Sequence, residues 1–281
     1  MAQQLNIRNH SRDSAGLRYV YPVISRRAGG VSVGINLNPN NACNWRCIYC
    51  QVPNLKRGSA PPIDIKLLET ELRGFLVELI DGDFMRKHVP EGARRIMDVA
   101  ISGNGEPTSA EEFPAVVELA GQILQEFELA PQVKLRCITN GSLVSRDTVQ
   151  RGLRSIAAQG GEVWFKVDAA TPEAIARING VNLSVEQVAR NLERCAELCP
   201  TWVQTCMFKL DGEGPVAAEI AAYLALLGKV GAQKLQGVLL YSLARPSLQA
   251  EASRLSPLPQ AELEAIAARI AALGLAVRIS P

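Results

Sequence analysis

Apolar residues recur along the chain with two different periods. Short apolar stretches, some with a strict period of two, predict strands, and longer stretches with apolar residues every three or four positions predict helices. The expected strands span residues 31–40, 97–103, 133–140, 162–168, 202–208, 235–241 and 276–280. The expected helices span residues 64–80, 111–127, 145–159, 184–198, 215–230 and 259–273, and Asp64 is placed to cap the first of them.

This alternation of strands and helices predicts an α/β fold with a parallel sheet covered by helices. About six such units suit a partial (β/α)6 TIM-like barrel better than a closed eight-stranded barrel. The length of 281 residues and the hydrophobic content of 47% are sufficient for one large core. We expect residues 1–20, which are polar, to form an N-terminal arm or cap, and residues 21–281 to form a single domain.

The strand at residues 162–168 has one apolar face and one face with polar and aromatic groups. We expect the apolar face to contact helices and the other face to line an internal cavity, which places Trp164, Lys166 and Asp168 there together. Lys166 and Asp168 are therefore candidate catalytic residues. A cavity lysine could form a Schiff base with a carbonyl substrate; alternatively, it could pair with Asp168 or extend to solvent.

Charge and composition exclude some classes of protein. The net charge of +2 is too small for a general nucleic-acid coat, so any contact with RNA would need a local basic patch. No apolar run approaches the ~20 residues that span a bilayer, and the first residues do not resemble a secretory signal. We therefore expect a cytoplasmic protein without membrane contact. Its seven cysteines are then expected to be metal ligands, reactive thiols or buried side chains rather than disulfides.

Three cysteines, Cys43, Cys47 and Cys50, lie within eight residues, just after a predicted strand. Thiolates favour iron–sulfur clusters or zinc. A structural zinc site uses four ligands, and the nearest further cysteine is Cys137. A [4Fe–4S] cluster held by three cysteines leaves one iron open to bind a further molecule. We favour the cluster; a small zinc site or a ferredoxin-like carrier lacking one ligand is the alternative.

The spacing of these cysteines, with Tyr49 directly before the last one, resembles the motif of the radical S-adenosylmethionine (SAM) superfamily. The resemblance implies that the open iron binds the amino and carboxylate groups of SAM and that Tyr49 packs near the adenine. It implies that an electron from the cluster cleaves SAM to a 5′-deoxyadenosyl radical. It also implies a reductant protein such as flavodoxin or ferredoxin.

Two later loops extend the resemblance. Residues 102–108 (SGNGEPT) are similar to the family's glycine-glycine-glutamate loop, which binds the methionyl amine of SAM, and Asn140 is similar to a ribose-contacting position. The alternatives are an ordinary turn before a helix and a plain Asn-Gly turn. Asp168 ends the next strand, where ligands gather in such sheets, and its alternative role is a helix N-cap. The implied cofactor-binding residues are Tyr49, Gly103, Asn104, Gly105, Glu106, Asn140 and Asp168.

A narrower resemblance covers roughly residues 19–55. The segment from residue 21 to residue 30, running on through residues 34–36 into the cysteine motif, is similar to the group of radical SAM enzymes that includes the wyosine-base synthases of tRNA. It implies a tRNA guanosine as substrate. Those synthases carry a second cluster on cysteines upstream of the motif, whereas this chain has no cysteine before Cys43. Of the sequential Arg26 and Arg27, at most one is expected to face the cavity and to bind a carboxylate or phosphate.

The remaining cysteines admit two interpretations. Cys195, Cys199 and Cys206 could converge on a second cluster, or they could be buried apolar positions. Cys137 falls on an apolar strand face and is expected to be structural.

Three functions stay open from the sequence. The first is a radical SAM enzyme that abstracts hydrogen from a substrate, either a modified tRNA or RNA base or a small molecule. The second is an activase that generates a glycyl radical on a partner protein, because residues 241–246 resemble tails in that group. The third is a non-catalytic iron–sulfur carrier or zinc-binding module.

Overall fold

The computed structural model describes residue 5, residues 15–25 and residues 29–280. Within these residues, the main sheet has eight strands. β1 (Val20–Ser25) pairs with β2 (Gly30–Ile35) in antiparallel fashion, and all other neighbours in the order β1–β2–β5–β6–β7–β8–β10–β12 are parallel. The further strands are β5 (Ile96–Ile101), β6 (Lys134–Thr139), β7 (Glu162–Lys166), β8 (Thr201–Cys206), β10 (Gly237–Tyr241) and β12 (Val277–Ser280). The sheet curls without closing, which confirms the partial TIM-like barrel.

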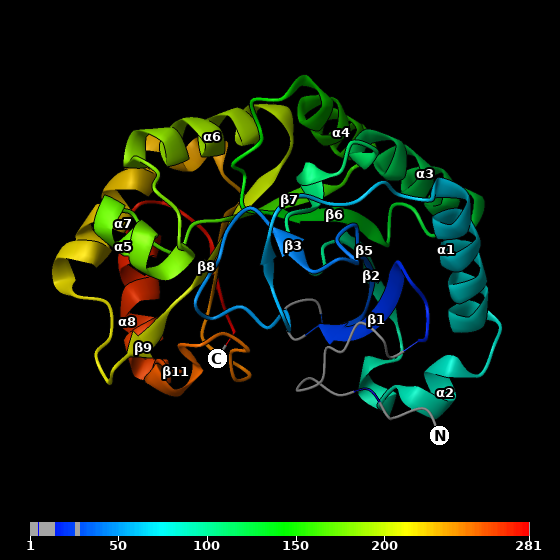
Figure 1. Ribbon diagram of the computed structural model, residues 1–281, viewed down its shortest axis with the longest axis horizontal. Coiled ribbons are helices and arrows are strands. Elements are labelled where there is room, and N and C mark those ends of the chain that lie inside the picture. Colours follow the sequence, from blue (N-terminus) through cyan, green and yellow to red (C-terminus); the bar gives the residue numbers. More distant parts are fainter. Residues whose placement is uncertain (1–4, 6–14, 26–28, 281) are drawn as a thin grey trace.

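Helices form an arc on the outer side of the curled sheet (Figure 1). Six of them begin and end within two residues of the expected bounds: α1 (Ile65–Ile80), α3 (Phe113–Glu126), α4 (Asp147–Ala158), α6 (Val185–Leu198), α7 (Ala217–Val230) and α8 (Gln260–Ala271). Asp64 caps α1 as predicted, since its side chain accepts a 3.0 Å hydrogen bond from the Leu67 amide. The short helices α2 (Phe84–His88) and α5 (Pro172–Asn179) were not expected from the pattern.

β1 was also missed, and its proline explains why. Pro22 cannot donate a ladder hydrogen bond, so a strand that contains it is an unlikely central strand but a suitable edge strand. β1 is the first strand of the sheet and pairs on one side only. The backbone amides of Arg18, Tyr19 and Val20 all donate to the buried carboxylate of Glu71 on α1, which fixes where the chain enters the sheet.

The two faces of β7 are separated as the period of two predicts. Val163 and Phe165 belong to the main core between sheet and helices, whereas Trp164 and Lys166 line an internal cavity. Most of the expected N-terminal arm, and Arg26 and Arg27, lie outside the described residues. No helix in the described part of the chain has the length and apolar character needed to cross a membrane.

Two small pairs of strands complete the fold. β3 (Ala42–Cys43) pairs with β4 (Lys56–Arg57) inside the arc, and β9 (Phe208–Leu210) pairs with β11 (Leu255–Pro257) near its end (Figure 1). The first pair carries Cys43, so the cysteine motif sits on the concave side of the sheet.

Candidate functional site

A cavity of about 610 Å³ lies on the concave side of the sheet. Its walls come from side chains on the cavity face of the strands and from the loops that follow β2, β5, β6 and β10. The sequence-predicted site residues that line it are Cys43, Cys47, Tyr49, Cys50, Gly103, Asn104, Gly105, Glu106, Asn140 and Lys166. Asp168 is not a lining residue; it is buried behind Tyr49 and Lys166.

Asparagine side chains hold the loop that leads into the cysteine motif. Asn36 Oδ1 accepts hydrogen bonds from the backbone amides of Asn38 and Asn104, each at 3.0 Å. Asn38 Nδ2 donates to the carbonyl oxygen of Ala42 at 2.9 Å. Asn36 and Asn38 were given no role from the sequence, although a run of asparagines before a metal motif is itself a signal for side-chain-to-backbone hydrogen bonds.

The glycines of the loop after β5 are required by this neighbouring loop. A Cβ on Gly105 would lie 2.0 Å from the carbonyl oxygen of Ala42, and a Cβ on Gly103 would lie 2.2 Å from Asn36 Oδ1. Neither position has room for a side chain. These two glycines therefore allow the loop after β5 to pack closely against the segment that leads into the cysteine motif.

Glu106 joins the ends of β5 and β6. Its Oε1 accepts hydrogen bonds from the hydroxyls of Thr108 and Thr139, both at 2.6 Å, and its Oε2 accepts one from the Asn140 amide at 2.7 Å. Burial raises the pKa of this carboxyl group, and the hydrogen bonds act in the opposite direction. Among the described residues Oε2 accepts a hydrogen bond from the Asn140 amide, and a carboxylate oxygen can accept two, so Oε2 can also accept one from an ammonium group.

Asn104 offers a second acceptor in the cavity wall. Its Nδ2 donates to Asn41 Oδ1 at 2.6 Å, but its own Oδ1 is buried and has no hydrogen-bond partner among the described residues. A buried carbonyl oxygen without a partner is costly unless a ligand supplies the donor. The SAM ammonium group, which has three donors, fits this position.

Asn140 connects β6 to the cysteine motif. Its Nδ2 donates to Asn44 Oδ1 at 2.9 Å, and its Oδ1 accepts a 3.0 Å bond from the Ser142 amide. It therefore forms the Asn-Gly turn that was the alternative interpretation. Its predicted contact with a ribose stays a prediction.

Asp168 lies at the centre of a polar network behind the cavity wall. Its Oδ2 accepts hydrogen bonds from the Tyr49 hydroxyl at 2.5 Å and from Asn179 Nδ2 at 3.0 Å. Its Oδ1 accepts one from the Cys206 amide at 3.0 Å and lies 3.5 Å from Lys166 Nζ. These partners come from four separate parts of the chain, so the carboxylate fixes the motif, α5, β7 and β8 relative to one another.

Lys166 points into the cavity as a charged group. Its Nζ donates to the Tyr241 hydroxyl at 2.9 Å and lies 5.0 Å from the centre of the Tyr49 ring. Burial by itself would lower the pKa of this amine, but Asp168 reverses the shift and the pKa is raised. Pairing with Asp168, one of the alternatives left open, is therefore present, and the charged amine is not a nucleophile in this state.

Three site residues were not assigned to the site from the sequence: Tyr241 and Cys206, which line the cavity, and Asn179, which contacts Cys47 and Asp168 behind its wall. Asn179 is the last residue of α5, a helix too short for a periodic pattern. Signals for it existed, since Thr171 and Pro172 are a typical N-cap and first residue and Gly180 is a typical left-handed C-cap.

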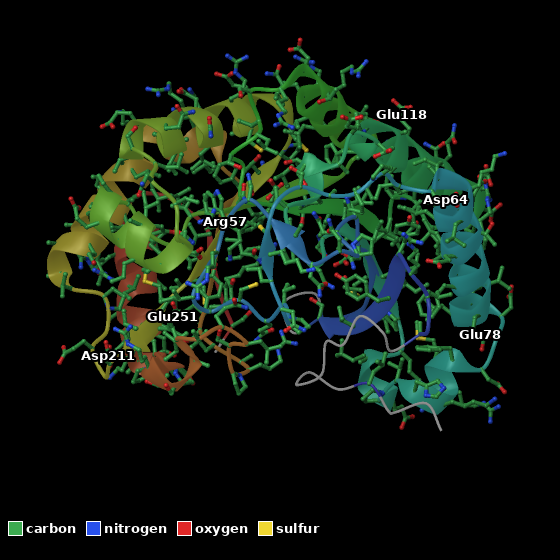
Figure 2. The ribbon with its side chains drawn as sticks, viewed as in Figure 1. Arg57, Asp64, Glu78, Glu118, Asp211 and Glu251 are labelled. Atoms are coloured by element: carbon green, nitrogen blue, oxygen red, sulfur yellow. The ribbon has the colours of Figure 1, made fainter. Side chains whose placement is uncertain are left out.

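The segment after β10 packs against the cysteine motif. Arg46 forms a two-pronged ion pair with Glu251, at 3.0 and 3.2 Å, and Ser247 Oγ donates to the carbonyl oxygen of Ile48 at 2.7 Å. On the motif's other side, Arg57 donates to the carbonyl oxygens of Asn44 and Gly180. Figure 2 labels Arg57 near the middle of the arc and Glu251 toward its lower left. Both ends of the motif are thus tied to distant parts of the chain.

The other cysteines do not gather into one group. Cys195 and Cys199 are in the main core, whereas Cys206 belongs to a separate cluster with Ile48 and Phe208. Cys137 is fully buried in the main core, as a structural residue would be. Within the described ranges, no three His, Cys, Asp or Glu side chains are gathered as ligands of a single metal ion. This finding does not bear on a [4Fe–4S] cluster, because its thiolates each bind a different iron and lie farther apart than the ligands of one metal ion.

The donor set of the motif fits a [4Fe–4S] cluster. Cys43, Cys47 and Cys50 all line the cavity beside the loop after β5, and three soft thiols are the ligands that iron–sulfur clusters use. Burial raises the pKa of the Cys43 and Cys47 thiols to about 12, so both are protonated in the metal-free protein and must lose protons to bind iron.

Comparison with known proteins identifies the class. The profile of the Radical SAM superfamily matches residues 37–221. The chain therefore belongs to this superfamily, whose members use a [4Fe–4S] cluster and SAM. The superfamily predicted from the cysteine spacing is thereby confirmed.

Individual relatives are more distant. A UPF0026 protein of Helicobacter pylori is 32% identical over 159 residues, which are 56% of this chain and 44% of the relative. The match thus spans less than half of that relative. Among solved structures, TYW1 with a lysine-pyruvate adduct bound has a TM-score of 0.56 at 17% identity, over 95% of this chain and 78% of that one. A radical SAM methyltransferase from Sphaerobacter thermophilus has a TM-score of 0.58 at 12% identity, over 89% and 66%. At these identities the two structures show a shared fold.

Proposed function

We propose that the protein cleaves SAM reductively at the cluster held by Cys43, Cys47 and Cys50, and that the resulting 5′-deoxyadenosyl radical takes a hydrogen atom from a substrate in the same cavity. The observation that carries the proposal is that the three motif cysteines, the loop after β5 and Lys166 line one cavity of about 610 Å³. The cluster and SAM supply the radical chemistry when bound. Residues 21–281 act as one catalytic domain.

The protein's own residues bind and position the reactants. Asn104 Oδ1, which is buried and lacks a donor among the described residues, and Glu106 Oε2 are the proposed acceptors for the SAM ammonium group. Tyr49 and Asn140 line the same wall and are the proposed contacts of the adenosine part. The glycines of the loop keep these acceptors close to the motif.

Lys166 is the proposed substrate-side group, and Asp168, behind the cavity wall, is the proposed positioning residue for it. The ammonium of Lys166 is held by Tyr241 and Asp168 on the cavity face of β7, so it presents a fixed positive charge to a carboxylate, phosphate or carbonyl oxygen. We propose a base of tRNA or another RNA, or a small molecule, as the substrate class. We further propose a flavodoxin or ferredoxin as electron donor and a cytosolic setting, which keeps the motif thiols reduced.

The experiment that tests this function is anaerobic incubation of the reconstituted protein with SAM and dithionite, followed by mass spectrometry for methionine and 5′-deoxyadenosine. The wild type should hold about four irons per chain and form both products. A variant with Cys43, Cys47 and Cys50 replaced by alanine should hold no cluster and form neither. Cys137→Ala is the matched control, because this cysteine is buried in the core away from the cavity. A triple variant that keeps its cluster would refute the assignment.

Lys166→Met tests the substrate-side role. Loss of a hydrogen bond from a charged donor costs about 1.5–3 kcal/mol, or about 10- to 150-fold in substrate turnover, whereas SAM cleavage in the absence of substrate should fall less. Lys209→Met is the control, because Lys209 pairs with Glu262 outside the cavity. Equal losses in both reactions would contradict this role.

If a purified partner protein instead acquires a glycyl radical, detected by electron paramagnetic resonance, the activase alternative replaces the substrate proposal.

A further inference from the structure

We propose that Asn179 is a positioning residue for the iron–sulfur cluster, which donates one amide hydrogen to the sulfur of Cys47 and the other to Asp168 and so raises the reduction potential of the cluster. The inference rests on the proposed function, because it requires the cluster at the cysteine motif. It assigns a role to a residue that lies outside the cysteine motif and was not singled out from the sequence.

The geometry of Asn179 uses both of its amide hydrogens. Its Nδ2 lies 3.3 Å from Cys47 Sγ and 3.0 Å from Asp168 Oδ2. A thiolate and a carboxylate are acceptors only, so the nitrogen and not the oxygen of the amide must face them. Asn179 is 2% exposed, and water therefore does not compete for these two bonds.

The backbone holds this side chain against the motif. The amide of Arg46 donates to the carbonyl oxygen of Asn179 at 3.0 Å, and the amide of Ile48 donates to that of Ile178 at 2.9 Å. The helix then ends at Gly180, whose φ of +66° favours glycine and where a Cβ would lie 2.7 Å from the Arg46 carbonyl oxygen. The end of α5 is thus docked on the residues that flank Cys47.

The expected direction of the effect follows from charge. Reduction of a cluster adds one electron, and part of that negative charge resides on the ligand sulfurs. A hydrogen bond to a more negative sulfur is stronger, so the Asn179 amide stabilises the reduced form more than the oxidised form and raises the potential. The carboxylate of Asp168 has the opposite effect, because a nearby negative charge disfavours the added electron.

The test measures the midpoint potential of the cluster. The reconstituted protein is titrated with dithionite, each cluster takes up one electron, and electron paramagnetic resonance detects the reduced form. Asn179→Leu should lower the equilibrium constant for reduction about three- to tenfold, equivalent to about 28–59 mV for one electron. Asp168→Asn should shift the potential upward. Asn191→Leu is the matched control: Asn191 is another buried asparagine, paired with Gln187 on α6, and its loss should leave the potential unchanged.

Opposite shifts in Asn179→Leu and Asp168→Asn support the inference, since a merely structural role would lower iron content or stability without that pattern of sign. An unchanged potential in Asn179→Leu with about four irons overturns it. A folded variant that cannot hold iron also overturns it in favour of a structural role. If Asn179→Leu does not fold, Asn179→Ser, with a single shorter donor, takes its place under the same criteria. If the wild type itself holds no cluster, the proposed function is refuted. If the wild type holds a cluster and the potential of Asn179→Leu is unchanged, only the inference about Asn179 is refuted.

Discussion

The hydroxyl of Tyr49 donates a 2.5 Å hydrogen bond to Oδ2 of Asp168, so a residue inside the cysteine motif is joined directly to the segment that follows β7. The Tyr49 ring also packs 5.5 Å from the ring of Phe208. The aromatic residue before the last cysteine therefore has a structural partner in addition to its predicted place near the adenine.

Tyr49→Phe should lower the free energy of unfolding of the cluster-free protein by about 1.5–3 kcal/mol, because the lost hydrogen bond has a charged acceptor. Tyr223→Phe is the matched control, since its buried hydroxyl pairs with the neutral Thr205 at 2.7 Å and its loss should cost about 0.5–1.5 kcal/mol. Urea denaturation measures both. A smaller loss for Tyr49→Phe than for the control would show that the bond to Asp168 contributes little.

Gly105→Ala should prevent the loop after β5 from packing on the cysteine loop, because the new Cβ would meet the Ala42 carbonyl oxygen at 2.0 Å. We expect a loss of iron content after reconstitution and a lower melting temperature. Gly228→Ala, in α7 with open space around its Cβ position, should instead stabilise the protein by about 0.5–1 kcal/mol. Normal iron content in Gly105→Ala would mean that the two loops can separate without harm.

Glu106→Gln should weaken SAM binding about 10- to 150-fold, the equivalent of losing a charge-assisted hydrogen bond of about 1.5–3 kcal/mol. Equilibrium binding of SAM to the oxidised, reconstituted protein provides the measurement. Glu71→Gln controls for stability, because Glu71 is also a buried carboxylate that accepts backbone amides but lies away from the cavity. If both variants bind SAM equally well, Glu106 is a structural residue only.

The stability of the cluster-free protein should fall at high pH through Cys43 and Cys47. Burial raises their pKa from 9.0 in the unfolded chain to about 12, so the folded state prefers the protonated thiols. Their contribution is fully present below pH 9 and is lost as the pH rises from 9 toward 12, by at most about 1.4 kcal/mol per pH unit for each thiol. The variant with both cysteines replaced by alanine should lack this part of the decline in urea denaturation. Parallel curves for the two proteins between pH 8 and 10.5 would contradict the raised pKa values.

The sequence by itself determined the features that depend on local spacing and period. The intervals between Cys43, Cys47 and Cys50 are read directly from the order of residues in the chain, and they were sufficient to indicate the superfamily. The period of two along β7 placed Lys166 on the cavity face, because successive side chains in a strand must point to opposite sides. The six long helices were likewise visible in their own apolar pattern.

Only the tertiary structure decided which of these residues meet. Asn179 reaches the sulfur of Cys47 across 132 positions of sequence, and Tyr241 reaches Lys166 across 75. Such contacts depend on the order of the strands and on how α5 docks against the motif, and no local pattern encodes either. The same holds for Gly105, whose neighbour proved to be a carbonyl oxygen of another loop. Spacing along the chain fixes which chemistry is present, whereas the packing of distant segments fixes which groups act on one another.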